Sequence, residues 1–136
     1  MTTPYKVEII LRCTSISGGG VTVICQWTQG SDNWGTALET DGRDWTTTDE
    51  YTEEGVLCDT ANTYYKWEID PSLIDFTKVL YVRFRDSAEN DTNTKNSTFA
   101  SANNSTSDYR PKCRITYLNP NGGTTARLLS LTGIGS

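Results

Sequence analysis

Alternation of apolar and polar residues, which is typical of a strand with one buried face, is clearest in the N-terminal part of the chain. Residues 6–13 carry apolar side chains at every odd position, with Glu8 and Arg12 on the opposite face. Residues 21–28 alternate in the same way, and the glycine-rich segment Ser17–Gly20 between the two runs is a turn signal. We therefore expect these two strands to form a β-hairpin.

Shorter apolar runs bounded by turn residues predict the remaining strands. These runs are residues 56–58, 64–69, 79–85, 111–118 and 126–131. Asp70 followed by Pro71 predicts the start of a short helix, with Asp70 as its N-cap. The segment Asn119–Gly123 predicts a turn, and the polar composition of residues 28–49 and 86–108 predicts long loops.

Short strands separated by turns, with almost no helical periodicity, place the chain in the all-β class. We expect a single antiparallel β-sandwich or jelly roll with long polar loops and at most one short helix. The chain has 136 residues, a length that suits one domain over residues 1–136.

Composition and charge exclude several classes of function. The net charge is -5 and the twelve Lys and Arg residues are scattered, so we expect no nucleic-acid partner. Histidine is absent, which removes the commonest general base and every Ser-His or Cys-His pair. The acidic residues show no sign of converging on a cleft, so we do not expect an enzyme. No apolar run is long enough to span a bilayer.

The four cysteines, Cys13, Cys25, Cys58 and Cys113, form no Cys-x-x-Cys pair. Without histidine they do not suit a structural zinc site. Strand alternation places Cys13, Cys25 and Cys113 on apolar faces, so we expect buried free thiols. Disulfides are the alternative if the protein works outside a reducing compartment.

The order of features in the second half of the chain resembles a known family. An aromatic strand, a short helical turn, a hydrophobic strand, a polar loop and a strand introduced by Arg-Pro follow one another at residues 65–70, 71–75, 79–84, 97–101 and 108–117. This order is similar to the C-terminal half of the DNRLRE-type domains. The resemblance covers about residues 7–118 and implies a jelly-roll module of a bacterial or archaeal surface protein, related to carbohydrate-binding modules.

The C-terminal tail, residues 122–136, is where this chain departs from the family order. Its residues 126–134 resemble a family strand that precedes the Val7 strand, and the first third of the family domain is missing. The resemblance therefore implies a permuted chain or a strand exchanged between subunits, with Ala126, Leu128, Leu129 and Leu131 as the donated residues. The alternative is a final edge strand of the same domain.

Aromatic residues in polar surroundings are the candidate binding residues. Trp34 and Trp45 lie in a long polar stretch, and Tyr81, Arg83 and Arg85 share the outward face of one strand. Sugar rings stack on exposed aromatic faces, and an interface also favours Tyr, Trp and Arg, so both uses stay open. The alternative for Trp34 and Trp45 is that they cap the ends of the sandwich.

One acidic loop is a candidate metal site. Asp86, Glu89, Asn90 and Asp91 offer the oxygen ligands that Ca²⁺ prefers, without matching the EF-hand pattern. A structural Ca²⁺ would be the only cofactor expected here. The alternative is an ordinary acidic turn.

Together these observations predict a non-enzymatic structural or adhesive subunit of an extracellular or phage virion assembly, such as a decoration, fibre or tail component. Its partners would be further copies of the chain or other proteins of the virion or cell surface. No export signal is visible at the N-terminus, which a virion protein does not need. The alternative function is a carbohydrate-binding module that stacks sugars on exposed aromatic residues.

Overall fold

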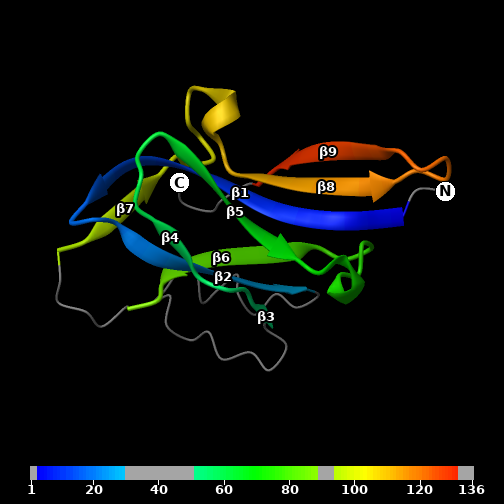
Figure 1. Ribbon diagram of the computed structural model, residues 1–136, viewed down its shortest axis with the longest axis horizontal. Helices are drawn as coiled ribbons and strands as arrows, with labels where there is room; N and C mark the ends of the chain where they lie inside the picture. Colours follow the sequence, from blue (N-terminus) through cyan, green and yellow to red (C-terminus); the bar gives the residue numbers. More distant parts are fainter. Residues whose placement is uncertain (1–2, 30–50, 89–93, 132–136) are drawn as a thin grey trace.

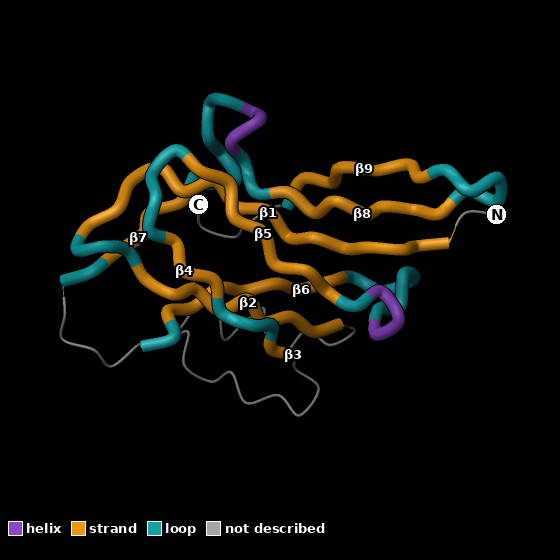
Figure 2. Tube along the Cα trace, in the orientation of Figure 1, coloured by secondary structure: helices purple, strands orange, loops and turns teal. Residues whose placement is uncertain are grey.

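The computed structural model describes residues 3–29, 51–88 and 94–131, which form two antiparallel β-sheets stacked in two layers (Figure 1 and Figure 2). Sheet A has the strand order β5-β1-β8-β9, and β7 pairs with the far end of β1. Sheet B contains β2, which pairs with β3, β4 and β6. The strands of sheet A are β1 (Thr3–Ser17), β5 (Thr63–Ile69), β7 (Asn96–Phe99), β8 (Lys112–Leu118) and β9 (Thr124–Ser130). Those of sheet B are β2 (Val21–Gln29), β3 (Tyr51–Thr52), β4 (Val56–Cys58) and β6 (Leu80–Asp86). The predicted all-β sandwich is confirmed.

The first two strands do not form the expected hairpin. β1 pairs with β5, β7 and β8, whereas β2 pairs only with strands of sheet B, so the turn at Gly18–Gly20 carries the chain from one sheet to the other. Alternation cannot distinguish the two arrangements, because each requires one apolar face per strand. Gly20 has a φ of 74°, and a Cβ there would overlap the carbonyl oxygen of Cys58. This approach of the turn to β4 explains the glycine.

The core lies between the two sheets. Its buried members come from both layers and include Ile9, Trp27, Trp67 and Ile69. The indole nitrogen Nε1 of Trp67 donates a 3.0 Å hydrogen bond to the carbonyl oxygen of Val23 in the opposite sheet. Burial of these large side chains supplies the main driving force for stacking the sheets.

All four cysteines are free and buried, including Cys13, Cys25 and Cys113, which alternation places on apolar faces. Burial raises the pKa of the Cys58 thiol to about 12 and that of Cys113 to about 11. Desolvation, reinforced by the charge of Glu53, also raises the pKa of Cys25. Thiols of this kind are neutral at physiological pH and pack as small apolar groups.

The described residues contain two short 3₁₀ helices, where at most one was expected. η1 (Pro71–Leu73) begins as predicted, because the Asp70 carboxylate accepts a 2.9 Å hydrogen bond from the Ser72 N–H. η2 (Ser107–Tyr109) follows β7, and neither of these two elements was predicted. Their Asn, Ser, Thr and Asp residues carry no periodic apolar signal, and β7 forms because the far end of β1 offers it a partner.

Candidate functional site

The C-terminal tail forms β9, the last strand of sheet A. β9 pairs antiparallel with β8 of the same chain, without a bulge, so in the single chain the tail is the final edge strand that the sequence left as the alternative. All seven residues of β9 are exposed to solvent, and the exposed fractions of Leu128 and Leu129 are 59% and 51%. Leu131 follows the strand and packs against the core. β9 therefore extends sheet A beyond the area that the core protects.

The hydrogen bonds at both ends of the β8–β9 pair show which backbone groups of β9 face solvent. The backbone N–H of Asn119 donates a 2.7 Å hydrogen bond to the carbonyl oxygen of Gly123. The backbone N–H of Leu131 donates a 3.1 Å hydrogen bond to the carbonyl oxygen of Pro111. Hydrogen-bonded and non-hydrogen-bonded pairs alternate along an antiparallel ladder. The odd-numbered residues of β9 therefore bond to β8, and the even-numbered residues, among them Ala126, point their N–H and C=O groups to the open edge.

The outward residues of β6 lie on the predicted face of their strand. Tyr81 and Arg83 pair with the polar residues Thr28 and Gln26 of β2, and Arg85 pairs with Ile24. All three lie opposite the face of β6 that packs on the core. This face is covered at Arg83, which is only 9% exposed, and its cross-strand partner Gln26 is also buried. Alternation assigns a residue to a face of the sheet, but it does not reveal whether other parts of the chain cover that face.

The remaining predicted site residues lie mostly outside the described part of the chain. Trp34 and Trp45 fall there, as do three of the four candidate calcium ligands, Glu89, Asn90 and Asp91. Asp86 is described, and its carboxylate accepts a 2.9 Å hydrogen bond from the Ala88 N–H. Within the described ranges, no group of three or more Asp, Glu, Cys or His residues is arranged to hold a metal ion.

A buried carboxylate on the outer face of sheet A is the clearest feature that the sequence did not predict. Glu8 was expected to face solvent, yet it is only 3% exposed. Nε and Nη2 of Arg114 both lie 2.9 Å from Glu8 Oε1. Nζ of Lys6 and Nζ of Lys66 lie 3.5 and 3.6 Å from Glu8 Oε2. Three cations from three adjacent strands thus surround one carboxylate.

This arrangement determines the protonation of Glu8. Burial alone raises the pKa of the carboxyl group. The hydrogen bond and charge of Arg114, with the charges of Lys6 and Lys66, more than offset burial and leave the pKa below its ordinary value of 4.5. Glu8 is therefore ionised at neutral pH and holds the Arg114 guanidinium in place.

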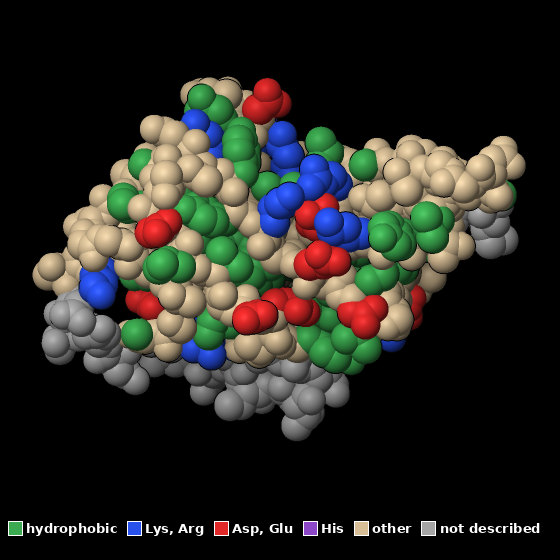
Figure 3. All heavy atoms as spheres, in the orientation of Figure 1, with side chains coloured by type: hydrophobic (Ala, Val, Ile, Leu, Met, Phe, Trp, Pro, Cys, Tyr) green, Lys and Arg blue, Asp and Glu red, His purple; other side chains and the backbone are tan. Residues whose placement is uncertain are grey.

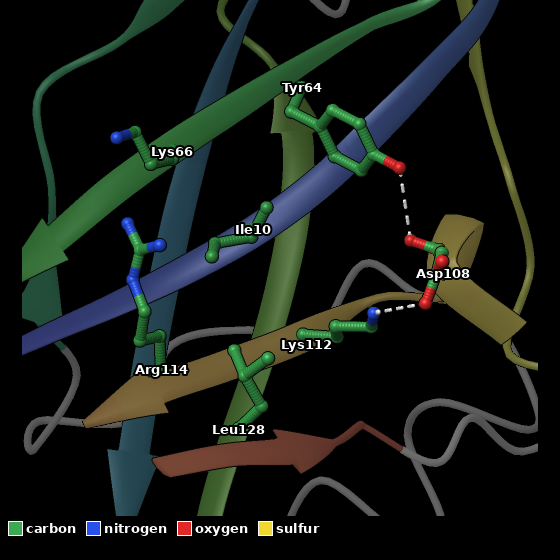
Figure 4. Close-up of a pocket in the computed structure, with 7 residues that line it drawn as sticks. All are labelled: Ile10, Tyr64, Lys66, Asp108, Lys112, Arg114 and Leu128. Atoms are coloured by element: carbon green, nitrogen blue, oxygen red, sulfur yellow. Dashed lines mark hydrogen bonds and ion pairs between the residues drawn. The ribbon is translucent and has the colours of Figure 1, made fainter. Parts of the chain in front are cut away.

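Next to this cluster, an open pocket of about 380 Å³ lies on the same face (Figure 4). Seven residues line it: Ile10, Tyr64, Lys66, Asp108, Lys112, Arg114 and Leu128. The register places Ile10 at the centre, paired with Lys66 of β5 on one side and with Lys112 of β8 on the other. Figure 3 shows Lys and Arg side chains gathered on the face that carries these strands.

One wall of the pocket is the loop that contains η2. The Tyr64 hydroxyl donates a 3.1 Å hydrogen bond to the Asp108 carbonyl oxygen, and Lys112 Nζ lies 3.7 Å from Asp108 Oδ1 (Figure 4). The guanidinium carbon of Arg12 lies 3.7 Å from the ring centroid of Tyr109. These contacts hold η2 above the sheet and place the Asp108 carboxylate at the rim of the pocket.

Sequence reasoning missed this pocket because its residues are distant in the chain. Alternation assigns Glu8, Lys66 and Arg114 to outward faces, but only the register of β5, β1 and β8 brings them together. A usable signal was nevertheless present, because Glu8 is the lone acidic residue of its strand and the 111–118 strand carries Lys112 and Arg114, a combination that favours cross-strand ion pairs.

Comparison with known proteins adds no family assignment. No family model, no curated protein and no solved structure matches the chain. The resemblance to DNRLRE-type domains therefore stays a prediction. Among the described residues, no helix has the length and apolar character needed to cross a membrane.

Proposed function

We propose that this protein is a non-enzymatic structural subunit that associates with further copies of itself through the open edge of β9. The observation that carries the proposal is the exposure of all seven residues of β9, which lies at one end of sheet A and pairs with β8 on one side only. The assembly would be extracellular or part of a virion. That setting is supported by the polar, histidine-free composition and by the resemblance to surface-protein modules.

The edge of β9 carries few of the features that normally prevent strands from pairing between molecules. Natural edge strands are protected by Pro, by bulges or by charged side chains, especially Lys. β9 has no Pro and no bulge, and Arg127 is its only charged residue. β5, at the opposite edge of sheet A, carries both Lys66 and Glu68. The contrast favours β9 as the edge that associates.

Pairing at this edge would also bury apolar surface. Leu128 lies on the outer face of the sheet, opposite Arg114, and Leu129 lies on the core-facing side, opposite Cys113. Both leucines are more than half exposed in the single chain. Two β9 strands arranged antiparallel about a two-fold axis would join two copies of sheet A into one continuous sheet, with self-complementary contacts.

The test is a proline at an outward-facing position of β9. Ala126→Pro removes an N–H group that points to the open edge and leaves the bonds to β8 intact. Ala126→Val keeps this N–H and is the matched control. We expect the native chain and Ala126→Val to be oligomeric and Ala126→Pro to be monomeric, measured by light scattering on a sizing column. Far-UV circular dichroism checks that all three are folded.

Two results would overturn edge pairing. A native chain that is monomeric at every concentration would exclude self-association through β9. An Ala126→Pro variant that stays oligomeric would exclude the open edge as the contact. If, in that second case, deletion of residues 122–136 gives a monomer, the strand is exchanged between subunits, because exchange uses the β8-facing groups that Ala126→Pro leaves in place.

A further inference from the structure

We propose that the pocket on the outer face of sheet A binds an acidic saccharide, a sugar chain that carries carboxylates. The pocket combines three kinds of group that such a ligand needs. Lys66, Lys112 and Arg114 supply positive charge, Tyr64 and Leu128 supply an apolar surface, and Asp108 supplies an acceptor for hydroxyl groups. The pocket shares Leu128 with β9, but its charged residues and Tyr64 lie outside that strand, so ligand binding does not require edge pairing.

The lysines have hydrogen-bonding capacity to spare. Lys66 Nζ lies 3.6 Å from Glu8 Oε2, and Lys112 Nζ lies 3.7 Å from Asp108 Oδ1. Both distances are longer than a charge-assisted hydrogen bond, which measures about 2.7–2.9 Å. Each ammonium group carries three donors, so both can bond to a carboxylate in the pocket without giving up a strong contact.

The third cation is fixed in advance. Arg114 bonds through Nε and Nη2 to Glu8, whose side chain is almost fully buried. The guanidinium has five donors, and those that do not face Glu8 stay available. Because Glu8 already holds Arg114, a ligand would not have to order this side chain, which lowers the cost of binding.

The apolar surface favours a sugar ring over a simple anion. Tyr64 and Leu128 are 47% and 59% exposed, and they border a pocket whose centre is Ile10. The C–H face of a sugar ring packs on aromatic and aliphatic side chains. A phosphate group would gain more from free backbone N–H groups, but β1, which forms the floor of the pocket, is paired on both sides.

The shape of the site suits a chain rather than a small enclosed ligand. The pocket is open to solvent and lies across β5, β1 and β8, with Lys66 and Lys112 on opposite sides of Ile10 (Figure 4). The protein as a whole carries a net charge of -5. Nonspecific attraction of a polyanion is therefore unfavourable, and binding would report on this local cluster.

The experiment measures equilibrium binding of polygalacturonate by calorimetry at low salt. Dextran provides a neutral sugar chain, and poly-L-glutamate provides carboxylates without sugar rings. We expect polygalacturonate to bind with an affinity that falls as salt rises. Poly-L-glutamate at equal carboxylate concentration should bind at least about fivefold more weakly, and dextran should show no binding.

Variants locate the site. Lys66→Ala and Lys112→Ala should each weaken polygalacturonate binding about fivefold. Lys78→Ala is the matched control, because Lys78 is an exposed lysine with a similar 3.8 Å ion pair to Asp75, outside the pocket. Tyr64→Ala should remove the preference for polygalacturonate over poly-L-glutamate, and Tyr64→Phe, which keeps the ring, should retain it.

Four results would overturn the proposal. Polygalacturonate that does not bind excludes the ligand class. Equal binding of poly-L-glutamate assigns the site to an acidic peptide instead. Equal binding of dextran removes the role of charge. A loss in Lys78→Ala as large as in Lys112→Ala shows that binding reflects overall charge and not this pocket.

Discussion

At the scale of single residues, Glu8 has the most unusual environment among the described carboxylates. Its side chain is only 4% exposed, although every cation that contacts it is at least one third exposed. Removing a buried charge from such a cluster leaves the partners without their acceptor and places like charges close together. Glu8 is therefore a site where one substitution has a large effect on stability.

We expect Glu8→Gln to lower the free energy of unfolding by about 2 kcal/mol, because it removes a buried charge that faces three cations. Glu68→Gln is the matched control. Glu68 lies directly opposite Glu8 in the register, but its side chain is 67% exposed and 3.9 Å from Lys6. Removing the charge of Glu68 should change the free energy of unfolding by less than about 0.5 kcal/mol. Urea unfolding at pH 7 measures both, and equal effects would contradict the role given to Glu8.

The same variants predict a dependence on pH. The pKa of Glu8 is lower in the folded protein than its ordinary value of 4.5, so the folded state holds this proton less tightly than the unfolded chain. The stabilisation is fully present above pH 4.5 and is lost as the pH falls through the folded pKa. The difference in unfolding free energy between the native chain and Glu8→Gln should thus shrink as the pH falls below 4.5. A constant difference would contradict this.

At the scale of elements, one hydroxyl of β7 links the two sheets. Ser97 Oγ donates a 2.6 Å hydrogen bond to the carbonyl oxygen of Cys58 in β4 and accepts a 3.0 Å bond from the N–H of Val21 in β2. Two backbone groups of sheet B are thus satisfied by a strand of sheet A. This contact fixes the end of the sandwich where the chain crosses between layers.

We expect Ser97→Ala to destabilise the fold by about 1–3 kcal/mol, because it leaves two partly buried backbone groups without partners. Thr98→Ala, at the next position of the same strand, is the control, since the Thr98 side chain is exposed. Thermal unfolding of the two variants measures the difference. Equal stabilities would show that water replaces the hydroxyl without cost.

At the scale of the whole molecule, the four buried thiols report on the integrity of the sandwich. Cys13, Cys25 and Cys58 are 0% exposed and Cys113 is 4% exposed. Burial raises the pKa of each of these thiols, which suppresses the reactive thiolate. The thiols are thus protected both from contact with reagents and from ionisation.

We expect no thiol to react rapidly with a disulfide reagent in the native protein at pH 8, and all four to react in urea without reductant. Absorbance of the released thiolate counts the reactive groups. Fewer than four reactive thiols in urea would indicate a disulfide and contradict the free cysteines described here.

Much of the fold follows from the sequence. The apolar residues at positions 7, 9, 11 and 13 are buried as their alternation predicts, and so are those at positions 23, 25 and 27 of the second predicted strand. Asp70 and Pro71 begin a helical turn as expected. These features are local, since a side-chain period of two and an N-cap are properties of a few consecutive residues.

What the sequence by itself determined is the class of fold, the strands with an apolar face and the burial of Cys13, Cys25 and Cys113. Only the tertiary structure decided that the first two strands lie in different sheets, that Arg83 is covered, and that Glu8 is buried among Lys6, Lys66 and Arg114. Only it showed the open edge of β9 and the pocket around Ile10. The physical reason is that alternation specifies only the two faces of a strand. Which strands pair, in which register, and whether an outward face is buried all depend on contacts between residues as far apart in the chain as Glu8 and Arg114.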